Sequence, residues 1–258
     1  MKFNIAVIGT GNLAWHLAPA LENAGHVVTE VFGRNPDKAA EITSRLYAAE
    51  ITDDLDFSES QAEVYILAVS DHAIPEIADS IILPENSLLV HTSGSTPMDI
   101  LAYSSASYIG TFYPLQSFTV SREINFGTIP ILYESDDKHA MNMLKALAQS
   151  VSSRSYYIKS RDRQALHIAA VFASNFTNHM LRLSEEILER QGLDFEMLKP
   201  LVVEQISKSL EMGPEASQTG PALRGDFSIL DQHYQFLNYR EQIAEIYKLI
   251  SQDIIDLN

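Results

Sequence analysis

A glycine-rich segment close to the N-terminus carries the clearest chemical signal in the sequence. Residues 9–14 read Gly-Thr-Gly-Asn-Leu-Ala and follow an apolar stretch from Phe3 to Ile8. Gly9 permits a tight turn, and Gly11 lets the backbone approach a pyrophosphate closely. A helix that begins near Asn12 would point free N–H groups and the positive end of its dipole at that anion. The pattern predicts a dinucleotide site made by Gly9, Thr10, Gly11, Asn12 and Leu13, with an incidental glycine turn as the alternative.

A second segment bears on which dinucleotide binds. Gly33, Arg34 and Asn35 follow the next apolar stretch, Val27 to Phe32. Chains that bind NAD usually place an acid here to accept hydrogen bonds from the ribose 2′-hydroxyl, whereas an arginine accommodates a 2′-phosphate. The planar guanidinium of Arg34 suits phosphate oxygens. We therefore predict NADP as the cofactor, held by Gly33, Arg34 and Asn35; the alternative is a solvated helix start formed by Arg34 and Lys38.

Two later apolar stretches end in small residues that include a serine. Ala68, Val69 and Ser70 close one of them, and Ser93 follows the other. Ligands of an open parallel sheet bind beyond the carboxyl ends of its strands. These four residues are therefore predicted to contact the cofactor, although residues 93–97 are equally compatible with a simple helix N-terminus.

The candidate catalytic residues lie on an expected long helix from Ala165 to Leu188. His167 and Asn175 are eight residues apart and are expected to share roughly one face. Histidine titrates near neutral pH, so His167 is predicted to exchange the proton that carbonyl reduction requires, while Asn175 orients the substrate. A hydrogen-bonded core histidine is the alternative.

Substrate-binding residues are expected in two other segments. The loop 219–226 is rich in Gly and Pro between strong helical patterns, which is typical of disordered or functionally shaped loops. In it Thr219, Arg224 and Asp226 are predicted to bind substrate, with Arg224 holding a carboxylate; Asp226 as a helix cap is the alternative. Gln116, at the end of another expected strand, joins this set.

The elements that must position these residues divide the chain into two parts. Apolar strand and helix patterns alternate through residues 1–158, which predicts an α/β fold with a Rossmann-type, mostly parallel sheet. Residues 159–258 show only helical patterns and are predicted to form an all-α domain. Its long helix, 165–188, is apolar on most sides and should be buried on most sides. A second helix is expected over 194–210 and a last one from about 229 to 257.

Composition excludes several classes of protein. The 258 residues are 46% hydrophobic, enough for a real core, and the net charge of −16 argues against nucleic acid and anionic membranes as partners. There is no cysteine, and the histidines show no zinc-like pairing, so no metal site is expected. The first residues lead directly into an expected strand and no apolar run approaches the length of a membrane span, so a cytoplasmic protein without a signal peptide is expected.

Taken together, the motifs resemble those of bacterial Rossmann-like proteins with a DUF2520 C-terminal domain, a group related to pyrroline-5-carboxylate reductase and the β-hydroxyacid dehydrogenases. The segments that carry the resemblance are 9–14, 33–35, 68–71, 91–94, 113–118, 167–175 and 219–226. The resemblance implies an NADP-dependent oxidoreductase, a helical domain similar to that of 6-phosphogluconate dehydrogenase, and a homodimer built through the helices. It does not imply a substrate.

One departure concerns the proton donor. The β-hydroxyacid dehydrogenases use a lysine on the first long helix, and this sequence has none between Lys159 and Lys199. His167, or a proton carried by the substrate, is expected to replace it. We therefore expect hydride transfer between NADP(H) and a small carbonyl, alcohol or imine substrate in a cleft between the domains.

Two alternatives stay open. One is a non-catalytic NADP-binding redox sensor or assembly partner, which the missing lysine favours. The other is a pyrroline-5-carboxylate reductase; however, the Ser-Gly-Pro-Ala stretch of that family is not found on the long helix, and Gly220-Pro221-Ala222 lies in a later loop.

Overall fold

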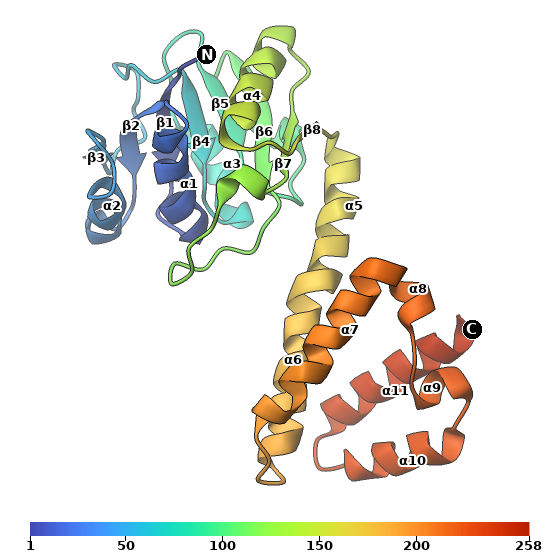
Figure 1. The fold of residues 1–258 in the computed structure, drawn as a ribbon. Helices are drawn as coiled ribbons and strands as arrows, with labels where there is room; N and C mark the ends of the chain where they lie inside the picture. The colour runs from blue at the N-terminus through green and yellow to red at the C-terminus, as the bar shows by residue number, and fades with distance from the viewer. Residues whose placement is uncertain (258) are drawn as a thin grey trace. The chain divides into compact units, whose positions relative to one another are not determined.

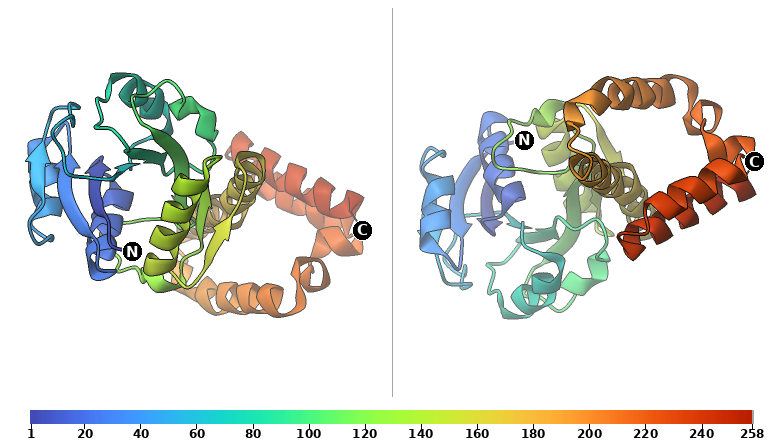
Figure 2. Two further views of the ribbon diagram at one scale, coloured as in Figure 1. Left: turned by 90° about the horizontal axis from the view of Figure 1, so that it is seen from above. Right: turned by 90° about the horizontal axis from the view of Figure 1, so that it is seen from below.

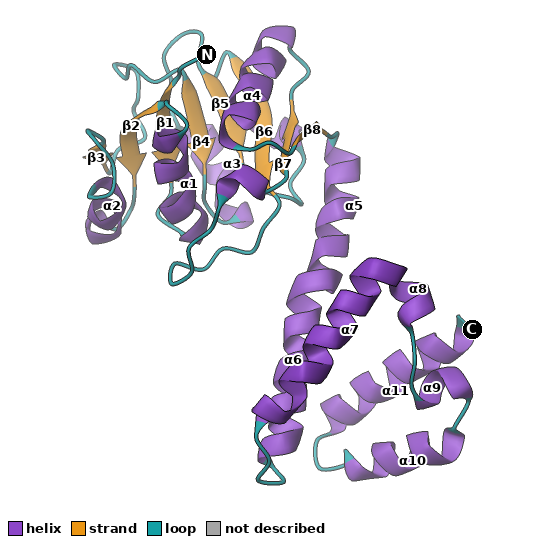
Figure 3. Cartoon of the chain, viewed as in Figure 1, coloured by secondary structure: helices purple, strands orange, loops and turns teal. Residues whose placement is uncertain are grey.

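A computed structural model of the chain describes residues 1–257 and divides into two compact units, Met1–Ser174 and Asn175–Asn258. The strands described all belong to the first unit, and the described part of the second is helical (Figure 3). The predicted fold class, a Rossmann-type sheet domain followed by helices, is confirmed. The compact units divide later than the predicted boundary between residues 158 and 159, which stays a prediction.

The sheet has eight strands in the order β3-β2-β1-β4-β5-β6-β7-β8 (Figure 1). Its first six strands have the spatial order of a dinucleotide-binding sheet, and they are parallel. β7 runs antiparallel to β6, a reversal that the alternating sequence pattern did not indicate. The strands are β1 (Asn4–Ile8), β2 (Val27–Phe32), β3 (Glu50–Thr52), β4 (Val64–Leu67), β5 (Leu88–His91), β6 (Tyr108–Pro114), β7 (Ile131–Glu134) and β8 (Ser155–Tyr157).

Helices cover both faces of this sheet. The helices α1 (Asn12–Asn23), α2 (Pro36–Thr43) and α4 (Lys138–Val151) share one core cluster. On the opposite face, α3 (Ile74–Ser80) and the 3₁₀ turn η2 (Met98–Leu101) share a second cluster. Figure 2 shows α1 and α4 on one side of the strands, with α3, which follows β4, and η2, which follows β5, on the other.

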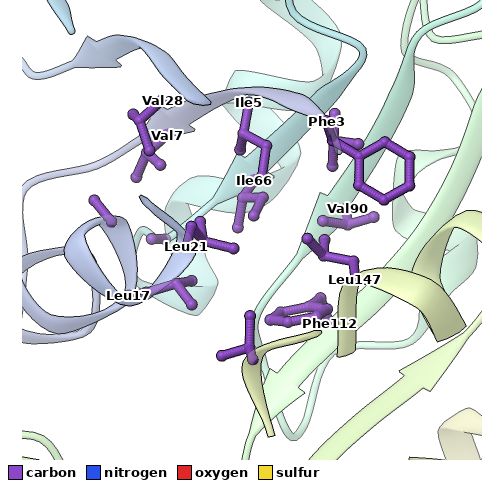
Figure 4. Packing of buried hydrophobic residues seen from close by; sticks show 14 of the residues in the cluster. Phe3, Ile5, Val7, Leu17, Leu21, Val28, Ile66, Val90, Phe112 and Leu147 are labelled. Carbon is purple, nitrogen blue, oxygen red and sulfur yellow. The ribbon is translucent and has the colours of Figure 1, made fainter. Parts of the chain in front are cut away.

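Alternation along β1 explains this layering. Ile5 and Val7 face the first cluster, whereas Ala6 and Ile8 face the second, because successive side chains of a strand point to opposite faces. Leu17 and Leu21 of α1 pack on the first face and are fully buried (Figure 4). Each such leucine stabilises the fold by roughly 1.5–3 kcal/mol. The turn between β1 and α1 therefore rests on a rigid base.

The stretch predicted as one long helix, 165–188, is helical throughout, but its middle is π-helical. A helix α5 (Ser160–Ala170) is followed by a π-helical stretch, Val171–Phe176, and then by α6 (Thr177–Glu189). The prediction that this stretch is buried on most sides is wrong for a single chain, because Ile168 is 51% exposed and Phe172 is 64% exposed. An apolar surface of this kind is expected to be covered by another protein surface.

The second unit contains more helices than predicted. α7 spans Lys199–Met212, and the loop after it carries the short helices α8 (Pro214–Ser217) and α9 (Pro221–Arg224). The expected last helix is two helices, α10 (Phe227–Phe236) and α11 (Glu241–Asp256), separated by a turn at the buried Leu237. Among residues 1–257, none of the helices has the length and apolar character that crossing a membrane requires.

Candidate cofactor and active site

The turn after β1 has the backbone geometry that a phosphate needs. Gly9 has φ +125°, and a Cβ there would lie 2.4 Å from the carbonyl oxygen of Ala68, so only glycine fits. A Cβ on Gly11 would meet nothing within 4 Å, which means that this backbone faces open space. Gly11 is also the N-cap of α1 and, because it has no side chain, it supplies no cap hydrogen bond to the helix. The first N–H groups of α1 thus stay available to an anion.

A cavity of about 440 Å³ opens at this turn. It is lined by all the residues predicted to bind the cofactor except Ser93; they are Gly9, Thr10, Gly11, Asn12, Leu13, Gly33, Arg34, Asn35, Ala68, Val69 and Ser70. The carboxyl ends of β1, β2 and β4 converge here, because these strands are parallel neighbours in the sheet. The individual contacts of these residues to a cofactor stay predictions.

The charge of this cavity suits a phosphorylated dinucleotide. Arg34 and Lys38 both line it, and its lining contains no acidic side chain, although the chain as a whole carries a net charge of −16. Asn35 caps α2, because its Oδ1 accepts hydrogen bonds from the backbone N–H groups of Asp37 and Lys38 at 3.0 and 3.3 Å. The cap fixes the start of α2 beside Arg34. NADP, with its 2′-phosphate, fits these residues better than NAD.

Ser93 plays a structural part in the loop after β5. It is buried, and its hydroxyl accepts hydrogen bonds from the backbone N–H groups of Ser95 and Thr96 at 3.1 and 2.9 Å. Ser93 thus stabilises a turn. The alternative of a helix N-terminus at residues 93–97 does not describe it, because the 3₁₀ turn η2 begins only at Met98. The predicted contact of Ser93 with the cofactor stays a prediction.

The next residue of that loop lies against a tyrosine–histidine pair. The Tyr113 hydroxyl and the His167 Nδ1 are 2.9 Å apart, and the two rings meet edge to face with centroids 5.9 Å apart. A Cβ on Gly94 would stand 2.5 Å from His167 Nδ1 and 2.8 Å from the Cζ of Tyr113. The φ of Gly94 is not in the left-handed region, so close approach is what requires a glycine here. β5, β6 and α5 therefore bring three residues together at one point, which we call the Gly94–Tyr113–His167 cluster.

A buried ion pair fixes the helix that carries His167. Arg163 is fully buried on α5, and its Nη1 donates to Glu134 Oε2 on β7 at 2.7 Å and to the Thr111 hydroxyl at 3.1 Å. Its Nη2 donates to the Thr96 carbonyl oxygen at 2.6 Å. Ser160 adds hydrogen bonds from its backbone N–H and its hydroxyl to the same carboxylate. The two buried charges are therefore paired, although the buried Nε of Arg163 has no hydrogen-bond partner among the described residues.

This ion pair connects the helix to the loop at the sheet edge. Arg163 and His167 are four residues apart on α5 and lie on the same side of the helix. Arg163 also holds Thr96, which is two residues after Gly94. The position of the imidazole is thus set from both sides, by the helix and by the loop.

Burial shapes the protonation of two neighbouring residues. It raises the pKa of Tyr113, the Asp71 carboxylate raises it further, and the Arg163 charge opposes the shift. Burial also lowers the pKa of His91 to about 3, with the Arg163 charge as a second cause. Tyr113 is consequently a neutral phenol and His91 a neutral imidazole at physiological pH.

The other predicted residues are spread over the chain. Gln116 lies just after β6, is exposed, and accepts a hydrogen bond from the backbone N–H of Ser117 at its own Oε1. Asn175 is exposed within the π-helical stretch, where the 3.6-residue period used to predict a face shared with His167 does not hold. Its shared face with His167 and its role in orienting substrate stay predictions.

The loop residues belong to the second unit. Thr219 lines an apolar cavity of about 310 Å³ in that unit. Arg224 and Asp226 form an exposed ion pair, with Nε and Oδ2 2.9 Å apart, and Asp226 makes no side-chain cap on α10. The guanidinium is thus already paired, and substrate binding by Thr219, Arg224 and Asp226 stays a prediction.

The sequence reasoning missed Gly94, Tyr113 and Arg163 as partners of His167. Tyr113 and Gly94 lie in segments that carry the family resemblance, but neither was predicted as a site residue. Arg163 precedes His167 by one helical turn, and that spacing was the available signal that the two side chains share a face of the helix. The contacts themselves join β5, β6 and α5, and no local pattern indicates them.

Two family models match the chain. The domain described as DUF2520 matches residues 129–254, and the domain described as NADP oxidoreductase, coenzyme F420-dependent, matches residues 4–94. The search among curated proteins found no match.

Solved structures resemble the chain over nearly its whole length. A "putative NADP oxidoreductase" from Bacteroides fragilis is 36% identical, with a TM-score of 0.90 and coverage of 99% of this chain and 98% of that one. A protein from Thermotoga maritima is 24% identical, with a TM-score of 0.78 and coverage of 98% and 99%. A reductive aminase from Aspergillus terreus in complex with NADPH has the same fold at 13% identity, with a TM-score of 0.72 and coverage of 100% and 95%.

These likenesses agree with the cavity described above. The relative from Bacteroides fragilis covers the full arrangement of sheet and helices, and the N-terminal family model ends at Gly94 of the cluster. The chain belongs to the family of DUF2520-containing, NADP-dependent oxidoreductases, and its cofactor is NADP.

Proposed function

We propose that this oxidoreductase uses NADPH to reduce a small imine or carbonyl compound, with His167 as the proton donor. The observation that carries the proposal is the Gly94–Tyr113–His167 cluster. It lies where β5 and β6 end, on the side of the sheet at which open parallel sheets bind their ligands. An imidazole can exchange a proton with a substrate bound at this position.

The proposed reaction divides the work between cofactor and protein. Bound NADPH supplies a hydride, which carries both electrons to the carbon of the C=N or C=O bond. His167 in its protonated, imidazolium form gives the Nε2 proton to the substrate nitrogen or oxygen, becomes the neutral imidazole, and recovers a proton from solvent. The buried ion pair of Arg163 and Glu134 keeps the imidazole in place during this exchange.

The substrate class rests on weaker but concordant observations. Two structural neighbours bear the names reductive aminase and imine reductase, which favours a C=N substrate for this chain too. Next to the Gly94–Tyr113–His167 cluster, the cation Arg163 is already paired with Glu134. Asn175 and Gln116 are proposed to orient the substrate, and Thr219, Arg224 and Asp226 to bind it.

A turnover assay tests the proposal. Purified protein is mixed with NADPH and a panel of cyclic imines, keto acids and small ketones, and loss of the nicotinamide absorbance is followed. We expect turnover of at least one imine and a loss of about 100-fold or more in kcat for His167→Ala. The matched control is His139→Ala, because His139 is an exposed histidine whose ring lies tilted beside that of Tyr108.

The outcomes separate the remaining possibilities. Equal turnover by wild type and His167→Ala would remove His167 from the mechanism. Tight NADPH binding without turnover of any compound would favour the non-catalytic NADP-binding protein. Selective turnover of pyrroline-5-carboxylate would assign the chain to that reductase activity.

We also propose that the protein is a homodimer through its helical part. The core of the second unit has only four buried residues in its cluster, which is small for a unit of this length. The helix α7 buries none of its residues, and Leu201, Val203 and Leu210 on it are 64%, 66% and 82% exposed. Sedimentation of wild type as a dimer and of Leu201→Glu/Leu210→Glu as a monomer is expected; a monomeric wild type would contradict the proposal.

A further inference from the structure

We propose that Tyr113 selects the tautomer of His167: the phenol donates its proton to Nδ1, so that the neutral imidazole always presents Nε2–H as its donor. Tyr113 is then a positioning residue that acts through His167. The proposal rests on the proposed function only for its catalytic consequence, since the tautomer itself is a property of the free protein.

The contact between Tyr113 and His167 forms in the protein without a substrate. Tyr113 belongs to the interior strand β6, where it pairs with Leu132 of β7. Its hydroxyl lies 2.9 Å from His167 Nδ1, a normal length for a hydrogen bond between these atoms. Both rings press against Gly94, where a side chain would overlap both of them. The contact is therefore built into the packing of β5, β6 and α5.

The direction of the hydrogen bond follows from the available acceptors. A neutral phenol has one proton, and burial with the nearby Asp71 carboxylate raises the pKa of Tyr113 and keeps that proton on. If Nδ1 carried a proton and donated it, the phenol proton would need a second acceptor. Among residues 1–257, the Tyr113 hydroxyl has His167 Nδ1 as its hydrogen-bond partner and no other. The phenol therefore donates, and the neutral ring must carry its proton on Nε2.

The second ring nitrogen is left to face a ligand. No hydrogen bond to Nε2 of His167 is found in the described part of the chain, and the residue is only partly buried. A hydrogen-bonded Nδ1 and an accessible Nε2–H together make a directed donor. Without the phenol, the neutral ring would be free to place its proton on either nitrogen and would offer the site a donor only part of the time.

Nitrogen NMR of the histidine rings tests the tautomer directly. The full-length protein is labelled with ¹⁵N at its histidines, and the ring signals of His167 are assigned by their loss in His167→Gln. At pH about 8.5, well above the pKa of an ordinary histidine, we expect the Nε2–H tautomer in wild type. Tyr113→Phe, which removes only the hydroxyl, is expected to give a mixture of both tautomers.

The matched control is Tyr108→Phe on the same strand. The Tyr108 and His139 rings lie with their centroids 5.2 Å apart, and no hydrogen bond joins these two residues in the described part of the chain, so the Tyr108 hydroxyl should not affect any tautomer. For turnover, we expect Tyr113→Phe to lower kcat about tenfold, the loss of roughly one hydrogen bond, with the KM for NADPH unchanged. Tyr108→Phe should keep the wild-type kcat.

Two results would overturn the proposal. One is the Nδ1–H tautomer in wild type, which would make Tyr113 the acceptor. The other is an unchanged Nε2–H tautomer in Tyr113→Phe. Because the NMR measurement needs no substrate, an Nε2–H tautomer in a protein that turns over nothing would leave this inference standing and refute the proposed function instead.

Discussion

The substitution Gly94→Ala places one methyl group at the centre of the proposed site. The new Cβ would lie 2.5 Å from Nδ1 and 2.7 Å from Cγ of His167, and 2.8 Å from Cζ of Tyr113. Ordinary contacts between such atoms are about 3.5–4.0 Å, so the rings must withdraw by roughly 1 Å. The backbone of Gly94 accepts alanine without strain, because its φ is not in the left-handed region. The perturbation is therefore almost purely a displacement of the Tyr113–His167 pair.

Stability and activity should respond very differently. Overpacking costs about 1–3 kcal/mol, and the reduced entropy of the unfolded chain returns about 0.4–1 kcal/mol, so the free energy of unfolding should fall by only about 1–2 kcal/mol. A misplacement of about 1 Å in a catalytic group can lower the rate about 100-fold. We expect kcat to fall by that order, while the Kd for NADPH stays close to that of wild type.

The assay combines kcat, the Kd for NADPH and urea unfolding in three variants. Gly127→Ala is the matched control, because its Cβ would meet only the Asn125 side chain, at 3.1 Å. Gly94→Ala and Tyr113→Phe disrupt the same hydrogen bond, so the double variant should lose little more than Gly94→Ala alone. Wild-type kcat in Gly94→Ala, or fully additive losses in the double variant, would refute the reasoning.

Three further predictions concern the cofactor, the ion pair and pH. Arg34→Ser should weaken NADPH about 10- to 100-fold and leave the Kd for NADH nearly unchanged in a fluorescence titration, and equal weakening of both would contradict the 2′-phosphate assignment. Glu134→Gln leaves Arg163 buried and unpaired and should lower the free energy of unfolding by about 3–5 kcal/mol, whereas Arg224→Gln in the exposed pair should change it little; similar effects of the two would be inconsistent with the ion pair described. Burial lowers the pKa of His91 from 6.5 to about 3, so between these pH values the unfolded chain binds a proton at His91 and the folded protein does not. The free energy of unfolding should therefore be unaffected by His91 above pH 6.5 and should fall as pH falls from 6.5 towards 3. His91→Gln should flatten that pH dependence in urea unfolding and His139→Gln should not; an unchanged slope in His91→Gln would count against the burial of a neutral imidazole.

The sequence predicted the nucleotide-binding half of the fold well because its signals are local. Val27–Phe32 is a strand with the predicted bounds, and the glycines at 9 and 11 stand in the turn that was expected. Strand, turn and helix follow one another within a few residues there, so the spacing of the residues along the chain is enough to predict how they are arranged. The same applies to Arg34, which directly precedes the Asn35 cap of α2, and to Lys38, in the first turn of that helix; both line the cavity.

What the sequence could not provide are contacts between distant strands and helices. The pairing of Tyr113 with His167 joins residues 54 positions apart, and the bond of Arg163 to Glu134 spans 29. β7 runs antiparallel to β6, and a long irregular connection joins the two strands. A connection of this length has no short hairpin turn that would indicate the reversal. The π-helical stretch at Val171–Phe176 was not predicted either. It contains no proline or glycine that would indicate a departure from α-helical geometry.

Transfer of deuterium from the cofactor tests the central claim most directly. NADPH carrying deuterium at both C4 positions is incubated with the wild-type protein and the imine that it turns over best, and the product is analysed by mass spectrometry and NMR. The account predicts one deuterium on the former C=N carbon of the product, and a rate of incorporation about 100-fold lower in His167→Ala. Bound NADPH that delivers no deuterium to any compound of the panel would contradict the account.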